Sequence, residues 1–180
     1  MKIFDPINTP LTGTNLIEAS AGTGKTYAIS GLFLRLVLEK QLPVDQILVV
    51  TFTKAATEEL KERIRNTLLE AKSAFLKNSS HDIFVEAIVR KYENRSIAIQ
   101  LIQDALTDFD NASIFTIHGF CQRILHENAF ETQSLFDTEL VTDPTGLTRE
   151  IVDDFWRKYS AFPQHKTSLS VLKKLLMGLY

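Results

Sequence analysis

Eight residues near the N-terminus read Ala19-Ser20-Ala21-Gly22-Thr23-Gly24-Lys25-Thr26. The stretch before them, residues 14–18, predicts a short strand, and the apolar spacing of residues 28–37 after them predicts a helix. A small-residue turn between a strand and a helix lets successive main-chain N–H groups converge on an anion. The helix N-terminus adds about half a positive charge. We therefore predict a phosphate-binding loop at residues 19–26.

Two side chains of this loop have the chemistry that a nucleoside triphosphate requires. Lys25 would reach the β- and γ-phosphates of ATP, and the Thr26 hydroxyl would bind Mg²⁺, which prefers hard oxygen ligands. We assign these two residues to catalysis and the whole loop to cofactor binding. Ala19 replaces the first glycine of the general pattern Gly-x-x-x-x-Gly-Lys-Thr. The alternative is a small-residue turn that begins a helix and binds no ligand.

The rest of the chain predicts an α/β part followed by helices. Apolar runs at residues 47–52 and 113–117 predict strands of a parallel sheet, and a helical pattern follows each of them. Two further amphipathic helices are predicted between the runs. Asp143 and Pro144 predict the start of another helix, and a last one, starting near Ser168, has an apolar stripe over residues 169–179. We place the α/β part at residues 1–135 and a helical segment at residues 136–180.

Composition excludes several other classes of protein. Twenty Lys and Arg residues against 22 Asp and Glu residues give a net charge of −2, so any contact with DNA must be local. The only cysteine, Cys121, cannot form an internal disulfide. We expect it to be a packing residue. Arg35 interrupts the longest apolar run, residues 31–38, which is far shorter than the roughly 20 residues of a membrane span. We expect a cytoplasmic protein without membrane contact.

Three motifs in a fixed order resemble superfamily one DNA helicases of the UvrD/Rep group, and within it the RecB-like helicase–nuclease subunits. They are the loop at residues 19–26, the segment from Val49 to Leu60 and the segment from Phe115 to Leu125. The likeness extends from about residue 5 to residue 156. It implies a partial RecA-like P-loop NTPase lobe, a parallel sheet with flanking helices, that binds ATP and Mg²⁺.

In that family the second and third motifs contact single-stranded DNA. The resemblance therefore implies DNA binding by Phe52, Thr53, Lys54, Thr116 and His118. These residues follow the predicted strands at their carboxyl ends, where open parallel sheets bind ligands. Structural alternatives remain open for three of them: Phe52 as a core residue, Thr53 as a helix N-cap and His118 as a turn residue.

Two parts of the family pattern are not found in these 180 residues. Asn8-Thr9-Pro10 replaces the glutamine-containing motif that reads adenine, and no predicted strand ends in the Asp-Glu pair that positions Mg²⁺. Asp153 and Asp154 imitate that pair, but they lie within a predicted helix. Hydrolysis needs charge stabilisation on several sides of the γ-phosphate. We therefore expect this segment alone to bind ATP without turning it over.

By resemblance, the whole protein is an ATP-dependent helicase and exonuclease subunit that acts in double-strand-break repair and recombination. Its implied partners are single-stranded and duplex-end DNA and the RecC and RecD subunits. The alternative function is a nucleotide-dependent protein-interaction module that docks a partner through residues 169–179 and does not translocate on DNA.

Overall fold

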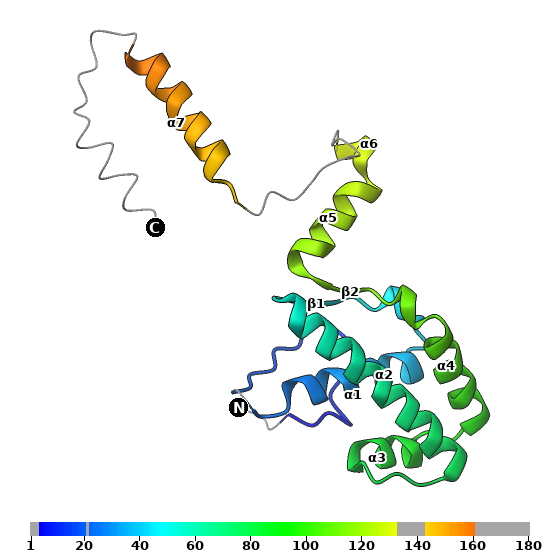
Figure 1. The fold of residues 1–180 in the computed structure, drawn as a ribbon. Helices are drawn as coiled ribbons and strands as arrows, with labels where there is room; N and C mark the ends of the chain where they lie inside the picture. Colours follow the sequence, from blue (N-terminus) through cyan, green and yellow to red (C-terminus); the bar gives the residue numbers. More distant parts are fainter. Residues whose placement is uncertain (1–3, 21, 133–142, 161–180) are drawn as a thin grey trace. The chain divides into compact units, whose positions relative to one another are not determined.

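The computed structural model describes residues 4–20, 22–132 and 143–160 (Figure 1). The chain divides into two compact units, residues 1–134 and residues 135–180. Within the described residues, the larger unit contains a small parallel sheet and the helices that pack against it, and the smaller unit contains one helix.

The sheet consists of β1 (Val49–Thr51) and β2 (Ile114–Thr116), which pair in parallel with Thr51 opposite Thr116. α2 (Lys54–Lys77) follows β1, and α5 (Ile117–Glu127) follows β2. Parallel pairing places the carboxyl ends of both strands, and the beginnings of both helices, at the same edge of the sheet. A parallel sheet flanked by helices is the predicted fold class, which is thereby confirmed.

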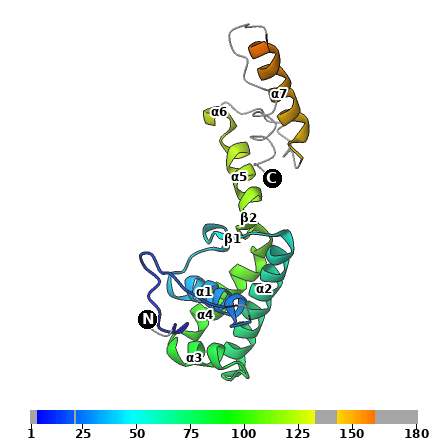
Figure 2. The same cartoon turned by 90° about the vertical axis from the view of Figure 1, so that its left-hand side faces the viewer.

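Four helices form the core of the larger unit. They are α1 (Lys25–Glu39), α2, α3 (Ile83–Lys91) and α4 (Arg95–Thr107), and Figures 1 and 2 show them together on one side of the sheet. The long α2 is central and buries Leu60, Ile64 and Leu68 at the predicted four-residue spacing. Two 3₁₀ turns, η1 (Val44–Gln46) and η2 (Phe109–Asn111), complete this layer.

Side chains cap most of these helices at their N-termini. Thr53 caps α2, Asp82 caps α3, Asn94 caps α4 and Thr116 caps α5, each accepting a hydrogen bond from a first-turn N–H group. The exception is α1, whose N-cap is Gly24 and carries no capping side chain. The helix that follows the predicted phosphate loop therefore begins differently from its neighbours.

The strand predicted at residues 14–18 is wrong. These residues have no strand structure, and Leu16 is 86% exposed. A strand forms only beside a neighbour that accepts its main-chain hydrogen bonds, and among the described residues β1 and β2 pair only with each other. The two observed strands are also shorter than the predicted apolar runs, because the chain bends at Phe52 and becomes helical at Ile117.

One side chain lies in an environment opposite to the one predicted, and one charged side chain is buried within an apolar run. Cys121 is exposed, because among the described residues nothing covers α5 deeply enough to bury any of its side chains. Arg35, which interrupts the apolar run of α1, is only 3% exposed. Arg123 is exposed, and its guanidinium lies over the Phe115 ring, 5.1 Å from the centroid.

The larger unit ends with α6 (Ala129–Thr132), and the helix of the smaller unit is α7 (Thr145–Ser160). The Asp143 carboxylate accepts the N–H of Thr145 at 3.0 Å, as expected for the residue before Pro144. The aspartates 153 and 154 lie within α7, so the predicted helical setting of this acidic pair is confirmed.

The helix predicted near Ser168 and the stripe at residues 169–179 lie outside the described residues. Within them, no helix has the length and apolar character needed to cross a membrane.

Candidate functional site

Two glycines shape the loop that leads into α1. Gly22 has a φ of 78° and Gly24 a φ of 86°, both in the left-handed region that side chains with a Cβ atom seldom adopt. Gly24 is also the N-cap of α1. These conformations turn the chain sharply between residue 20 and the helix, so the spacing of the two glycines has a structural reason.

The first turn of α1 offers unused hydrogen-bond donors. Helix geometry leaves the N–H groups of Lys25, Thr26 and Tyr27 without a helical acceptor, and no side chain caps this helix. Its first turn contains no acidic residue, and residues 22–25 are exposed. An anion at this helix end would therefore meet exposed donors and the positive end of the helix dipole without a competing carboxylate.

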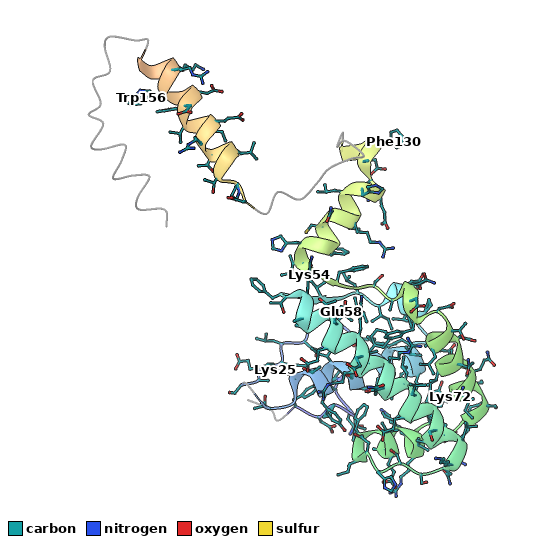
Figure 3. All side chains as sticks on the ribbon, in the orientation of Figure 1. Lys25, Lys54, Glu58, Lys72, Phe130 and Trp156 are labelled. Atoms are coloured by element: carbon teal, nitrogen blue, oxygen red, sulfur yellow. The ribbon has the colours of Figure 1, made fainter. Side chains whose placement is uncertain are left out.

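Lys25 carries the nearest full positive charge. Its Nζ donates hydrogen bonds to the carbonyl oxygens of Ser20 at 2.7 Å and Ala19 at 3.2 Å. The side chain therefore folds back along the loop instead of extending into solvent, and Figure 3 labels it at the start of α1. Thr26 is half-buried, and its carbonyl accepts the hydroxyl of Ser30 at 2.9 Å.

The residues of the loop fit a magnesium-bound triphosphate. Exposed N–H groups, a lysine ammonium and a threonine hydroxyl are suitable partners for phosphate oxygens and for a hard cation. The residues that meet here are Ala19, Ser20, Gly22, Thr23, Gly24, Lys25 and Thr26, whereas Ala21 lies outside the described residues. A hollow of about 340 Å³ that Tyr27 helps to line is unsuitable for phosphate, because its lining has one arginine, Arg63, against four carboxylates: Glu59, Glu62, Glu70 and Asp82.

A second group of candidate residues meets at the carboxyl edge of the sheet. Phe52 follows Thr51, and Ile117 follows Thr116, the strand partner of Thr51. Phe52 is 80% exposed, so it is not a core residue within the described part of the chain. Exposure alone does not assign a binding role to Phe52, because Leu16 and Ile83 are exposed to a similar degree.

The two threonines at this edge are helix caps. Thr53 accepts the N–H of Ala56 at 3.1 Å, and Thr116 accepts the N–H of Gly119 at 3.1 Å. Capping is therefore the structural role of both threonines. The alternative interpretation of Thr53 as a helix N-cap is confirmed. Their hydroxyls also mark where α2 and α5 begin.

The edge is locally favourable for anions even though the chain as a whole is not basic. Lys54 and His118 are exposed there, in the first turns of α2 and α5, and neither first turn contains an acidic residue. Two helix N-termini and a lysine thus face the same solvent region, where Figure 3 labels Lys54. Nucleic-acid phosphates could bind here by local charge alone.

Comparison with known proteins places this geometry in a family. A model of the UvrD/REP helicase N-terminal domain matches residues 3–177. The chain belongs to the UvrD/REP helicase family. Its N-terminal loop and sheet edge are therefore parts of a UvrD/REP helicase N-terminal domain, and the resemblance predicted from the three motifs is confirmed.

Curated relatives of this UvrD/REP helicase chain are RecB subunits. The RecBCD enzyme subunit RecB of Escherichia coli (strain K12) is 43% identical over 166 residues, 88% of this chain and 14% of the relative. RecB of Haemophilus influenzae is 42% identical over 170 residues, 87% of this chain and 14% of the relative. RecB of Mycolicibacterium smegmatis is 40% identical over 159 residues, which are 87% of this chain and 14% of the relative. The chain spans about 14% of the length of these relatives.

Two supporting contacts in this helicase domain were missed by sequence reasoning. The Tyr27 hydroxyl donates to Asp82, 2.8 Å from one carboxylate oxygen and 2.9 Å from the other, and ties the first turn of α1 to the cap of α3. Burial, and then the hydrogen bond to Asp82, raise the pKa of Tyr27 to about 12. The phenol therefore remains a neutral donor. No local pattern could reveal a contact between residues 55 positions apart.

The other missed contact is centred on Arg35. Its guanidinium donates to both carboxylate oxygens of Glu39, at 2.7 and 3.0 Å, and to the carbonyls of Pro6 and Thr9, both at 2.9 Å. The hydrogen bond from Arg35 lowers the pKa of Glu39, and the nearby Lys91 adds to the effect. This buried arginine holds the N-terminal turn on α1, the helix that follows the predicted phosphate loop. In the sequence, the only sign of this contact is that Arg35 is a charged residue within an apolar run.

Proposed function

We propose that this chain is the ATP-binding part of the first RecA-like motor lobe of a RecB-like helicase subunit. In this assignment residues 1–135 form that part of the lobe, and residues 136–180 begin an inserted helical subdomain. The loop at residues 19–26 binds the phosphates of ATP, with Lys25 at the β- and γ-phosphates and the Thr26 hydroxyl on Mg²⁺. The bound cation would neutralise phosphate charge.

The observation that carries this proposal is the beginning of α1. This helix has a glycine N-cap, an uncapped and acid-free first turn, and a lysine whose ammonium is held over the loop. A capping side chain in place of Gly24 would stabilise the helix by only a few tenths of a kcal/mol, but a turn that merely started a helix would still gain from it. Four other helices of this unit, α2, α3, α4 and α5, each have one.

The carboxyl edge of the sheet is the proposed contact for single-stranded DNA. Phe52 would stack on bases, and Lys54 and His118 would face the phosphate backbone beside the caps Thr53 and Thr116. Stacking tolerates any base sequence and contributes about 1–3 kcal/mol per base. This suits a protein that moves along DNA of any sequence.

For the whole protein we propose ATP-driven translocation within a cytoplasmic helicase–exonuclease that repairs and recombines broken DNA. Its partners would be duplex ends, single strands and subunits that correspond to RecC and RecD. The names of the RecB relatives support this assignment. The 180-residue segment should bind ATP with negligible turnover.

Titration of a fluorescent ATP analogue with Mg²⁺ tests the nucleotide site. Lys25→Ala should lower affinity at least about ten-fold, because it removes charge-assisted hydrogen bonds of roughly 1.5–3 kcal/mol each. Lys40→Ala is the matched control, since Lys40 is an exposed lysine at the opposite end of α1. Equal affinities of the two variants would disprove the loop assignment, and rapid hydrolysis by the segment would disprove its predicted inactivity.

Fluorescence anisotropy with a labelled oligothymidylate tests the DNA edge. Phe52→Ala should weaken binding about five-fold or more. Ile83→Ala serves as control, because Ile83 is 83% exposed but begins α3, at the end of the unit away from the sheet (Figure 1). If both variants bind like the unaltered chain, Phe52 does not contact DNA.

A further inference from the structure

Three polar or charged side chains are buried among the described residues: Ser30, Arg35 and Thr57. Two of them donate to main-chain carbonyls, Ser30 to that of Thr26 and Arg35 to those of the N-terminal turn. Thr57 is 5% exposed and lies in the first turns of α2, on the face that otherwise buries Leu60 and Ile64. An apolar side chain would satisfy this core position, so the hydroxyl calls for a specific explanation.

The Thr57 hydroxyl belongs to a small hydrogen-bonded cluster. It lies 3.0 Å from the carbonyl oxygen of Thr53 and 2.6 Å from the hydroxyl of Thr51. The Thr51 hydroxyl is itself 3.1 Å from the same carbonyl oxygen. Each hydroxyl has one hydrogen, so one donates to the carbonyl while the other donates to its partner hydroxyl. The pair therefore connects β1, the following bend and α2.

The bend that this pair holds contains Phe52. Before the bend, Thr51 pairs with Thr116 in the sheet. After the bend, the carbonyl of Thr53 accepts a hydrogen bond from the hydroxyl pair. The hydroxyl of Thr53 in turn accepts the N–H of Ala56. The main chain is thus fixed on both sides of a ring that is 80% exposed. A contact residue whose position is fixed before binding loses less freedom on binding.

We propose that Thr51 and Thr57 are positioning residues that hold Phe52 in place for stacking on single-stranded nucleic acid. This inference rests on the proposed DNA contact of Phe52. Thr57 acts through the bend, because its burial keeps it from touching a ligand. Thr51 acts from the last position of β1.

The test is a double-mutant cycle in the 180-residue chain, read by anisotropy with labelled oligothymidylate. Thr57→Val keeps the side-chain shape and removes the hydroxyl, and it should weaken binding about two- to ten-fold, the range expected for one net hydrogen bond. Thr57→Ser restores a hydroxyl and should bind within about two-fold of the unaltered chain. The double variant with Phe52→Ala should bind no more weakly than Phe52→Ala alone.

The outcomes separate the two proposals. If Phe52→Ala binds normally, the DNA contact itself is wrong. If Phe52→Ala weakens binding and Thr57→Val does not, or if the two losses multiply in the double variant, the positioning role is overturned and the contact stands. Affinity for the ATP analogue should stay unchanged in Thr57→Val, which shows that the variant is folded. Should Thr57→Val fail to fold by circular dichroism, Thr51→Val removes the other hydroxyl and must produce the same loss.

Discussion

Replacing Arg35 by methionine should destabilise the larger unit strongly, although the new side chain is apolar and of similar length. The change removes four hydrogen bonds, two to Glu39 and one each to Pro6 and Thr9. The two carbonyls lose their donor, and among the described residues the Glu39 carboxylate keeps one charged partner, Lys91, whose Nζ is 3.4 Å away.

The expected magnitude follows from burial. Removing one partner of a buried ion pair costs about 3–5 kcal/mol, because the remaining charge stays desolvated. The Glu39 side chain is 27% exposed, so water can recover part of this loss. We therefore expect about 3 kcal/mol, the lower end of the range.

A matched control exists in α3. Arg90 pairs with Glu86 at 2.5 Å, also four residues apart, but its side chain is 77% exposed. Arg90→Met makes the same change in charge and should cost about 0–1 kcal/mol. Urea unfolding followed by circular dichroism should place the midpoint of Arg35→Met about 1–3 M below that of the control, given a slope of about 1–3 kcal/mol per M.

Hydrogen exchange supplies a local readout of the same change. The N–H groups of Ile7 and Asn8 donate to the Asp5 carboxylate, and that of Thr9 donates to the Asp5 carbonyl. Their exchange should accelerate in Arg35→Met and not in Arg90→Met. Equal midpoints and unchanged exchange at residues 7–9 would refute the role of Arg35 as a clamp on the N-terminal turn.

Three further predictions test the packing and the titrating groups. Gly31→Ala should lower stability by about 1–3 kcal/mol in thermal unfolding, because its Cβ would lie 2.8 Å from Cζ of the buried Phe84. Gly146→Ala is the control and should cause no such loss, because a Cβ at Gly146 meets nothing within 4 Å. Because the pKa of Glu39 is lowered, its carboxylate stabilises the fold above pH 4.5, its ordinary pKa, and this contribution is lost as the pH falls below that value. In a plot of unfolding free energy against pH, Glu39→Gln should therefore show a shallower decline on the acid side. In an ultraviolet titration one tyrosine should ionise near pH 12, and Asp82→Asn should lower that pKa, whereas an unchanged curve would contradict the hydrogen bond to Tyr27.

Much of the fold could be predicted because its signals are local. Four-residue spacing predicted the buried face of α2, and apolar runs predicted both strands of the sheet. Asp143 and Pro144 predicted the beginning of α7. The phosphate loop remains a prediction, which could be made because two glycines, a lysine and a threonine follow one another closely at residues 22–26. Such patterns depend on neighbours in the chain, which the sequence displays directly.

Tertiary structure decided what depends on distant neighbours. Residues 14–18 have the sequence of a strand but no strand beside them, and a ladder needs a second chain segment. Only packing shows that Phe52 is exposed while Arg35 and Thr57 are buried. Periodicity reports which side chains share a face of an element. What covers that face, and which carbonyl a buried donor reaches, is settled only when segments far apart in the chain come together.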